Sequence, residues 1–361
     1  MKWTEDLLLE KADRQRGQYQ LAMYAVHLST GSSSYLQSLK PGTIKEYVRA
    51  ASTLLLHFTG HDLRKDHDHD SSMGTILAPV YKALDQYDTI PDRREPYTLE
   101  MHRELLKQVA PFRTKAPEGP MCALTDWFAM GLCAGFRLSE WGQPSANADP
   151  RNPQKKRLGR RATTQALLPG DIRIKTESHR RATGLDILQY PLGSIRKMWI
   201  RFRWQKNGHH GEERLFTRNP SSNGHCFVAS MYSVLTRFQD LTALESLPVD
   251  TTPLGLYLDA ATGRVRLITS PIIESLMRSL ASVVYGFHPI DDATPLQQWG
   301  SHSLRVGACV ALHARGFSNI DIKWLLRWRS DAFMAYLQNI ALLADRHNRE
   351  LDRLAMMPHL I

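Results

Sequence analysis

A short block of strand-like sequence interrupts a chain that is otherwise typical of helices. The strand-like runs are residues 171–175, 186–190, 198–204 and one that begins at Arg214. Residues 205–211 carry a hairpin turn signal between the last two runs. Helical patterns precede the block at 99–109 and 121–133, and the segments after Cys226 are typical of helices joined by short loops. We therefore expect a mostly α fold with a small antiparallel β-sheet, an α+β arrangement.

The N-terminal part of the chain has its own helical pattern. Thr43 and Glu46 have capping-box spacing, and apolar residues follow at helical intervals until Gly60, which would end the helix. The stripe consists of Ile44, Tyr47, Val48, Ala51, Leu54, Leu55 and Phe58. A second apolar segment covers residues 76–84. This pattern predicts a small helical domain.

The length of the chain allows two separate hydrophobic cores. The 361 residues exceed what one small domain needs, and the prolines and charges of residues 91–96 are a candidate linker. We predict a helical domain at residues 1–95 and a mixed domain at residues 96–361.

Charge and cysteine usage narrow the class of partner. The formal net charge is +10 and the pI is about 9.5, which favours a polyanion: nucleic acid first, an anionic membrane surface second. No apolar run approaches the roughly 18 residues needed to span a bilayer, and residues 1–6 lack the apolar core of a secretory signal. The four cysteines include no Cys-x-x-Cys pair. We expect buried thiols in a reducing compartment rather than disulfides or a zinc site.

A basic stretch suggests contact with phosphates. Residues 143–165 are rich in Pro, Asn, Lys and Arg without any period, so we predict a long exposed loop. The candidate phosphate-binding residues are Lys155, Lys156, Arg157, Arg160 and Arg161, joined by Arg201 and Arg203 from a run that mixes aromatic and basic residues. Two alternatives remain open: a solubilising charged loop, or a nuclear-import signal at residues 155–161.

Three stretches carry the residue types that phosphodiester cleavage requires. They are residues 135–141, 301–307 and 326–336. Cleavage needs an in-line nucleophile, cations around the phosphorus and a proton donor for the leaving oxygen. Tyr336 is the predicted nucleophile, because a phosphotyrosine bond would allow rejoining without ATP. Arg137 and Arg305 are the predicted phosphate clamps, since a guanidinium is always charged and can bind two oxygens at once.

Three further side chains would support these groups. His302 lies three residues before Arg305, on the same helix face, with Ser301 as the expected cap, and would take the phenol proton. Trp328 would donate its indole N–H to a phosphate oxygen. Glu140 would orient a neighbouring basic group.

The leaving oxygen needs an acid. Lys206, at the tip of the predicted hairpin, is the candidate, and Lys197 is the alternative. No metal or other cofactor is expected, because arginines can supply the charge that magnesium supplies elsewhere. Residues 66–70 and the pair at 209–210 contain metal-ligand residue types, but we expect them to be solvated loop tips.

These residues together resemble the active site of the tyrosine recombinases, the phage-integrase family of DNA strand-exchange enzymes. The residues that fall in the family's order are Arg137, His302, Arg305, Gly307, Gly316, Trp328 and Tyr336. The resemblance implies site-specific recombination or integration of double-stranded DNA through a 3′-phosphotyrosine. It implies a helical core-binding domain and a catalytic domain of the DNA breaking-rejoining type that close around the duplex. It also implies a homotetramer, strand exchange through a Holliday junction, and exchange of residues 338–361 between protomers.

The resemblance also indicates a branch of the family. Trp328 and Tyr336 are one residue closer in sequence than in the well-known bacterial and phage members, and residues 327–333 are more similar to recombinases of Crypton-like eukaryotic mobile elements. The expected compartment is the nucleus in a eukaryote and otherwise the cytoplasm. Two alternatives remain: a type IB topoisomerase with similar chemistry, and a DNA-binding protein derived from a mobile element that has lost catalysis. Retention of the catalytic side chains favours an active enzyme.

Overall fold

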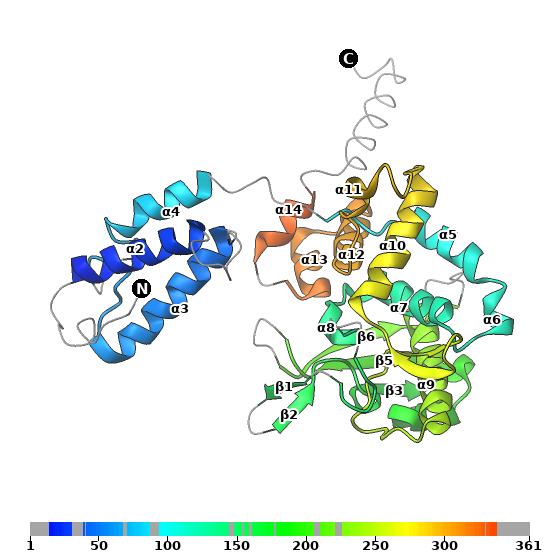
Figure 1. The fold of residues 1–361 in the computed structure, drawn as a ribbon. Helices are drawn as coiled ribbons and strands as arrows, with labels where there is room; N and C mark the ends of the chain where they lie inside the picture. The colour runs from blue at the N-terminus through cyan, green and yellow to red at the C-terminus, as the bar shows by residue number, and fades with distance from the viewer. Residues whose placement is uncertain are drawn as a thin grey trace, which may run out of the picture. The chain divides into compact units, whose positions relative to one another are not determined.

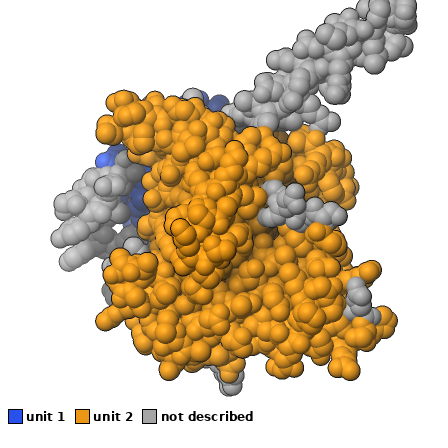
Figure 2. Space-filling view, turned by 90° about the vertical axis from the view of Figure 1, so that its right-hand side faces the viewer, with its two compact units in different colours: residues 1–92 blue, residues 93–361 orange. Residues whose placement is uncertain are grey.

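The structure, a computed structural model, divides the chain into two compact units. It describes residues 14–30, 39, 41–67, 71–86, 94–143, 148–153, 155–158, 161–176, 178–205, 210–220, 226–328 and 330–337. The units are Met1–Asp92 and Arg93–Ile361, coloured separately in Figure 2. The predicted mostly α fold with a small antiparallel sheet is confirmed (Figure 1). Within the described ranges, no helix is both long and apolar enough to cross a membrane.

The first unit is a small helical assembly. Its described helices are α2 (Arg14–Thr30), α3 (Pro41–Thr59) and α4 (Leu77–Gln86). The core includes Leu21, Ala25, Ile44, Val48, Leu77 and Leu84. Helix α3 begins at Pro41, whose fixed φ suits a first helical turn, so Thr43 lies inside the helix and the predicted cap is wrong. The helix ends before Gly60, which has a left-handed φ of 75°, as predicted.

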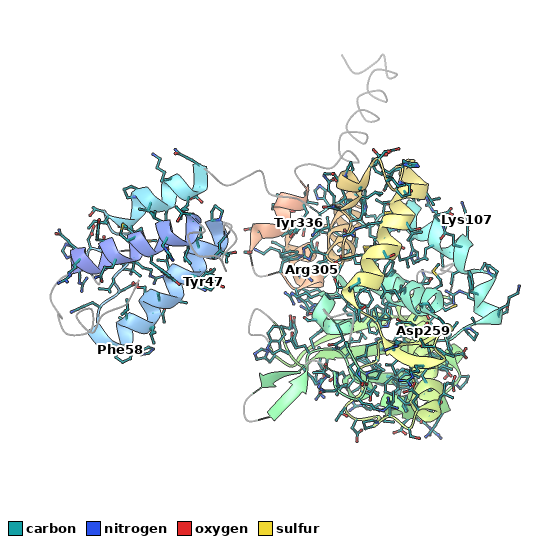
Figure 3. All side chains as sticks on the ribbon, viewed as in Figure 1. Tyr47, Phe58, Lys107, Asp259, Arg305 and Tyr336 are labelled. Atoms are coloured by element: carbon teal, nitrogen blue, oxygen red, sulfur yellow. The ribbon has the colours of Figure 1, made fainter. Side chains whose placement is uncertain are left out.

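The apolar stripe on α3 is wider than the face that it buries. Ile44, Val48 and Leu55 are buried, whereas Tyr47, Leu54 and Phe58 are exposed (Figure 3 labels Tyr47 and Phe58). Among the described elements, α3 packs mainly against α2 and to a smaller extent against α4, and these two helices occupy part of its circumference. Periodicity therefore located the helix correctly but overstated its core face.

The second unit holds most of the helices. They are α5 (Leu99–Val109), α6 (Phe112–Lys115), α7 (Pro120–Ala134), α8 (Leu138–Trp141), α9 (Phe227–Leu244), α10 (Ser270–Tyr285), α11 (Ala293–Leu296), α12 (Ser303–Ala314), α13 (Asn319–Leu326) and α14 (Met334–Leu337). Short 3₁₀ turns are η1 (Pro169–Asp171), η2 (Gly184–Gln189), η3 (Leu192–Ser194) and η4 (Asp331–Phe333). Helix α7 is almost wholly buried and packs against α5, α9 and α12. It is the apolar segment expected at residues 121–133, and α5 has the expected bounds.

A four-stranded antiparallel sheet lies beside these helices, with strand order β4-β3-β5-β6. The strands of the unit are β1 (Lys155–Leu158), β2 (Arg161–Thr164), β3 (Ile172–Thr176), β4 (Arg181–Thr183), β5 (Ile195–Phe202), β6 (Glu212–Thr217), β7 (Leu256–Asp259) and β8 (Arg264–Leu267). Alternation along β3 and β5 buries Ile174, Met198 and Ile200 in the same core as α9, while Arg173 and Trp199 face away. The sheet thus has one core face and one outer face.

One predicted strand is a turn, and one predicted loop contains a pair of strands. The run at 186–190 is not a strand, because residues 184–189 form the 3₁₀ turn η2. Its buried residues, Gly184 and Ile187, are three apart, which is the period of a 3₁₀ turn and not of a strand. The predicted loop at 143–165 contains the hairpin β1–β2, whose polar sequence lacks the alternation of a half-buried strand.

The expectation that only helices follow Cys226 was also wrong. Strands β7 and β8 pair there as a hairpin, with Leu256 opposite Leu267. The alternation of exposed and buried residues along β8 is visible in the sequence of residues 264–267 and was a usable signal. All four cysteines lie in described residues, and none of them is in a disulfide; Cys133 is exposed, so the prediction of four buried thiols was wrong for that residue.

Candidate active site

The predicted nucleophile and the predicted base are in direct contact. His302 immediately precedes helix α12, and Tyr336 lies on α14. The distance from His302 Nε2 to the Tyr336 hydroxyl oxygen is 2.9 Å, within hydrogen-bond range. The N-cap of α12 is His302 and not the expected Ser301, while the hydroxyl of Ser303 accepts a hydrogen bond from the N–H of Gly300.

Helix α12 is held tightly against the segment that precedes α5. The N–H of Tyr97 donates to the carbonyl oxygen of Ser303. A Cβ at Gly307 would lie 2.1 Å from the carbonyl oxygen of Tyr97, so only glycine permits this approach. Gly307 therefore has a packing role in this structure. This packing fixes the helix that carries the predicted base and one predicted clamp.

Arg305 is a buried cation beside the nucleophile (Figure 3 labels Arg305 and Tyr336). Its side chain is almost fully buried; one nitrogen donates to the carbonyl oxygen of Gly135 and another to that of Leu326 at 2.5 Å. Its guanidinium carbon lies 4.3 Å from the centre of the Trp328 ring, a cation–π contact. Gly135 has a left-handed φ of 54° at the end of α7, which turns this carbonyl to its position. Within the described part of the chain these two carbonyl oxygens are its acceptors, so three of the five guanidinium N–H groups have no described partner.

A buried carboxylate joins two more arginines to the site. Both oxygens of Glu140 accept hydrogen bonds of 2.9 Å from the guanidinium of Arg327. Arg137 donates to the same carboxylate through its side chain at 3.1 Å and through its backbone N–H at 2.9 Å. Arg137 also donates to the carbonyl oxygen of Arg327. The predicted orienting role of Glu140 thus has a geometric basis, with Arg327 as an additional partner.

The surroundings set the protonation states of the two reacting groups. The pKa of His302 is lowered to about 4, mainly because burial disfavours the charged ring. The positive charges of Arg305, Arg94 and Arg137 act in the same direction. Burial raises the pKa of Tyr336, and the charge of Arg305 opposes this rise. At neutral pH the imidazole is uncharged and the phenol protonated, so Nε2 can accept the phenol proton.

The arginines also influence one another. Burial and the charge of Arg137 lower the pKa of Arg305 to about 9. Burial by itself would raise the pKa of Glu140, but the charges of Arg327 and Arg137 outweigh it and the pKa is lowered. Three guanidinium groups therefore share one carboxylate, and the cluster retains positive charge. Such a cluster is suited to an anion.

Trp328 supplies a buried donor that lacks an acceptor. Its ring centre lies 5.7 Å from that of Tyr336. Among the described residues, no group accepts a hydrogen bond from its indole Nε1, although this atom is buried. A buried N–H without an acceptor is costly, and an incoming phosphate oxygen would satisfy it.

The predicted acid cannot be placed. Lys206 lies outside the described residues, and so does His209, the first residue of the pair at 209–210. Gln205, which directly precedes Lys206, is buried, and its side-chain oxygen accepts a hydrogen bond of 3.4 Å from Arg137. The alternative acid, Lys197, is exposed on β5. It precedes Phe202 by five residues, a separation of about 17 Å along the strand at about 3.3 Å per residue.

Two of the residues predicted to bind phosphates are paired with one buried carboxylate. Asp171 holds Arg203 at 2.7 Å and Arg201 at 3.3 Å, and the more exposed of the two is Arg201. Lys155, Lys156 and Arg157 belong to β1 and Arg161 to β2, while Arg160 lies outside the described residues. Their part in DNA binding stays a prediction.

The other ligand-type residues have structural partners where they are described. Asp66 accepts hydrogen bonds from the side chain of Gln18 and the N–H of Thr75. Within the described part of the chain, no group of three or more His, Cys, Asp or Glu residues could hold a metal ion. Residues 68–70 and the C-terminal segment 338–361 lie outside the described residues.

Two arginines of the site were not assigned from the sequence. Arg327 lies in a stretch that was singled out, but its left-handed φ of 59° and its pairing with Glu140 leave no local signal. Arg94 lies in the predicted linker and contributes to the low pKa of His302. Neither the period nor the spacing of nearby residues marks either one.

Comparisons with known proteins give low-identity structural matches only. No protein-family model matches the sequence, and no curated protein matches it. The chain is similar in structure to the Tn1549 transposon integrase in complex with transposon right end DNA, at 13% identity and a TM-score of 0.42, over 94% of this chain and 85% of that chain. It is also similar to the same integrase in complex with circular intermediate DNA, at 13% identity and a TM-score of 0.40, over 92% and 84% of the two chains.

Proposed function

We propose that this chain is a tyrosine recombinase that cleaves and rejoins double-stranded DNA. One observation carries the proposal: the Tyr336 hydroxyl is hydrogen-bonded to His302 beside a buried guanidinium and an indole N–H that has no described acceptor. Side chains from two short stretches, residues 302–305 and Trp328, surround one phenol. The indole N–H groups of Trp127 and Trp141 in the core also have no described acceptor, so the proposal depends on the combination of groups around Tyr336 and not on the indole donor alone.

The proposed step is a transesterification at phosphorus. The Tyr336 oxygen forms a bond to phosphorus, the bond from phosphorus to the 5′-oxygen breaks, and the DNA is left as a 3′-phosphotyrosine with a free 5′-hydroxyl. The phenol proton passes to His302 Nε2, and the 5′-oxygen gains a proton from a general acid. Rejoining is the reverse of this step, with no net loss of a high-energy bond. Neither ATP nor a redox partner is needed.

The arginines would stabilise the charge that develops on the transferring phosphoryl group. The charge of Arg305 acts on the phenol, and Arg137 is fixed through Glu140 to the same cluster. Trp328 would add one neutral donor to a non-bridging oxygen. Preorganised donors in a water-poor site are usually the largest single contribution to such catalysis.

Lys206 is the proposed acid for the leaving oxygen. It directly follows Gln205, which contacts Arg137, whereas Lys197 lies farther along β5. The high net positive charge fits duplex DNA as the partner. The helical first unit as a DNA-binding domain, the homotetramer, the exchange of residues 338–361, the Crypton-like branch and the nuclear location in a eukaryote belong to the same proposal.

The test is a covalent trap. We would incubate the protein with nicked suicide DNA that contains the repeats flanking its encoding gene, and look for an adduct resistant to SDS. Tyr336→Phe should abolish the adduct and keep DNA binding. Tyr257→Phe, on strand β7, is the matched control and should leave the adduct unchanged. An adduct that persists in Tyr336→Phe would exclude this nucleophile, and joining of the trapped strand to a second duplex would separate a recombinase from a type IB topoisomerase.

A further inference from the structure

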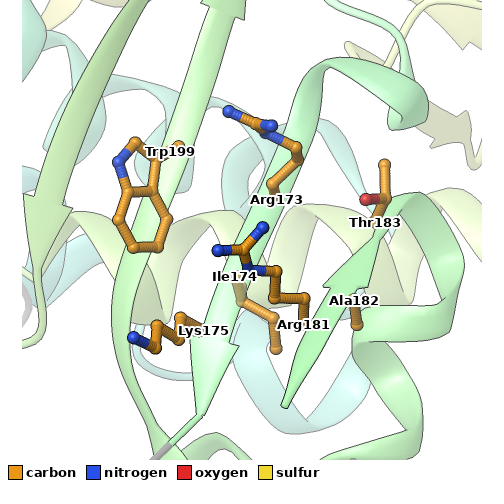
Figure 4. Close-up of a pocket in the computed structure, with 7 residues that line it drawn as sticks. All are labelled: Arg173, Ile174, Lys175, Arg181, Ala182, Thr183 and Trp199. Atoms are coloured by element: carbon orange, nitrogen blue, oxygen red, sulfur yellow. The ribbon is translucent and has the colours of Figure 1, made fainter. Parts of the chain in front are cut away.

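A pocket lies on the outer face of the main sheet, opposite the core. Its volume is about 440 Å³. Its described lining residues, shown in Figure 4, are Arg173, Ile174, Lys175, Arg181, Ala182, Thr183 and Trp199. They come from the three neighbouring strands β4, β3 and β5, and none of them is acidic. The volume is within the range of small-molecule sites, about 300–1,000 Å³.

Strand register places three cations in one row across this face. Lys175 on β3 lies directly opposite Arg181 on β4 and directly opposite Lys197 on β5. Side chains of directly paired residues share a face of the sheet, about 5 Å apart at Cβ. No described carboxylate forms an ion pair with any of the three. Like charges in this position reduce the stability of the sheet, so the fold by itself does not account for the row.

The next row of the same face supplies a flat aromatic surface. Trp199 on β5 lies opposite Arg173 on β3, two residues from the cationic row. Arg173 is already paired with Glu213, so the row contributes a neutralised cation and a partly exposed indole. A cationic row beside an aromatic ring is the combination that binds single-stranded nucleic acid: phosphates on the cations and a base stacked on the ring.

We propose that this pocket binds a nucleoside phosphate, as one unit of an unpaired nucleic-acid strand. The phosphate would lie on Lys175, Arg181 and Lys197, and the base would stack on Trp199. The core residues of β3 and β5 separate this face from the arginine cluster around Glu140. The proposal therefore stands whether or not Tyr336 cleaves DNA.

Fluorescence anisotropy with a labelled single-stranded oligonucleotide of about eight nucleotides, a length typical for such sites, tests the proposal. Trp199→Ala should weaken binding about tenfold or more, and Trp199→Phe should restore most of it because the flat ring is kept. Recovery by the conservative variant also shows that the loss is not a failure to fold. Equal binding by wild type and Trp199→Ala would overturn the proposal.

The cations have a separate readout in the salt dependence. Lys175→Ala and Arg181→Ala should each lower the slope of log K against log salt by about 0.7, the value for one phosphate contact on a single strand. Lys107→Ala, on helix α5 (labelled in Figure 3), is the matched control and should leave the slope unchanged. The same change of slope in all three variants would contradict a defined site.

Two further probes test the contribution of the base to binding and distinguish a nucleic-acid strand from a free nucleotide as the ligand. An abasic oligonucleotide of equal charge should bind about as weakly to wild type as the normal strand binds to Trp199→Ala; equal binding of both oligonucleotides to wild type would overturn the stacking. Competition by deoxyadenosine monophosphate distinguishes the sources. Failure to compete supports a strand as the ligand, and full displacement at micromolar concentration would replace the strand by a free nucleotide.

Discussion

Two basic regions of the second unit use their charges in opposite ways. Around Glu140 the guanidinium groups are buried and fixed by hydrogen bonds to a carboxylate and to backbone carbonyls. On the outer face of the sheet, Lys175, Lys197 and Arg181 stand in a row without a described carboxylate partner. The first region cannot rearrange cheaply, whereas the second is solvated and adjustable.

The difference indicates different tasks for similar side chains. Fixed donors in a buried site stabilise a transition state because no reorganisation is needed during the reaction. Exposed cations gain affinity through released counterions and respond strongly to salt. Substitutions in the first region should therefore change rate and stability, and those in the second should change binding only.

The sharpest contrast is between two lysines that could each have been the acid. Lys206→Ala should slow cleavage by about 10²- to 10⁴-fold, the usual contribution of a general acid. Lys197→Ala, in the cationic row, should cleave within about twofold of wild type when the DNA is saturating, because the row is proposed to bind a strand and not to react. Single-turnover cleavage of suicide DNA measures both. A substrate with sulfur in place of the 5′-bridging oxygen needs no acid and should rescue Lys206→Ala; lack of rescue would reject Lys206 as the acid.

Arg305→Lys should cost about 10²- to 10³-fold in cleavage rate, as for the loss of one preorganised donor. A lysine keeps the charge but cannot reach the carbonyl oxygens of Gly135 and Leu326 while it stacks on Trp328. The same single-turnover assay applies. A variant that cleaves at the wild-type rate would mean that charge alone is required, and the comparison of fixed with mobile cations would fail.

Glu140→Gln should destabilise the fold by about 3–5 kcal/mol, because it leaves buried guanidinium groups without their countercharge. Urea denaturation measures the change in the free energy of unfolding. Glu274→Gln is the control: Glu274 pairs with Arg278 on the partly exposed surface of α10, and its loss should cost under about 1 kcal/mol. Equal losses in the two variants would show that the buried cluster has no special role in stability.

Stability should fall as the pH is lowered from 6.5 toward 4, and His302 should account for part of the fall. Its pKa of about 4 in the folded state is below the ordinary value of 6.5, so the unfolded state takes up the proton first. The contribution between these pH values is on the order of 2–3 kcal/mol. Urea denaturation at pH 7 and pH 5 gives the change in the free energy of unfolding with pH. This change should be smaller in His302→Gln than in wild type, whereas His57→Gln, exposed on α3, should leave it as it is in wild type. An unchanged pH dependence in His302→Gln would mean that the ring takes up its proton at the same pH in the folded and the unfolded protein.

The helices and the convergence of the site could be predicted because their signals are local. Helix α5 has the expected bounds, and His302, Arg305, Trp328 and Tyr336 come from two short stretches near the end of the second unit. A helical period or a short motif contains the information that places these side chains. Contacts across a few residues are therefore accessible to sequence reasoning.

The remaining features depend on partners that are far apart in sequence. Arg327 and Glu140 are 187 residues apart, and the left-handed backbone of Arg327 gives no sign of that pairing. Arg203 was assigned to phosphates, but the structure pairs it with the buried Asp171. The hairpin β1–β2 is held by backbone pairing in a polar stretch, so no alternation of apolar and polar residues predicts it. Register across strands, which produced the cationic row, is likewise absent from any single stretch.

Mapping the covalent adduct tests the central claim most directly. The trapped complex would be digested with nuclease and trypsin, and the modified peptide sequenced by mass spectrometry. Tyr336 is the only tyrosine between the trypsin sites that bound residues 330–346. The account predicts a nucleotide attached to Tyr336 through its phenolic oxygen. A nucleotide on any other residue, in a protein that forms the adduct efficiently, would contradict it.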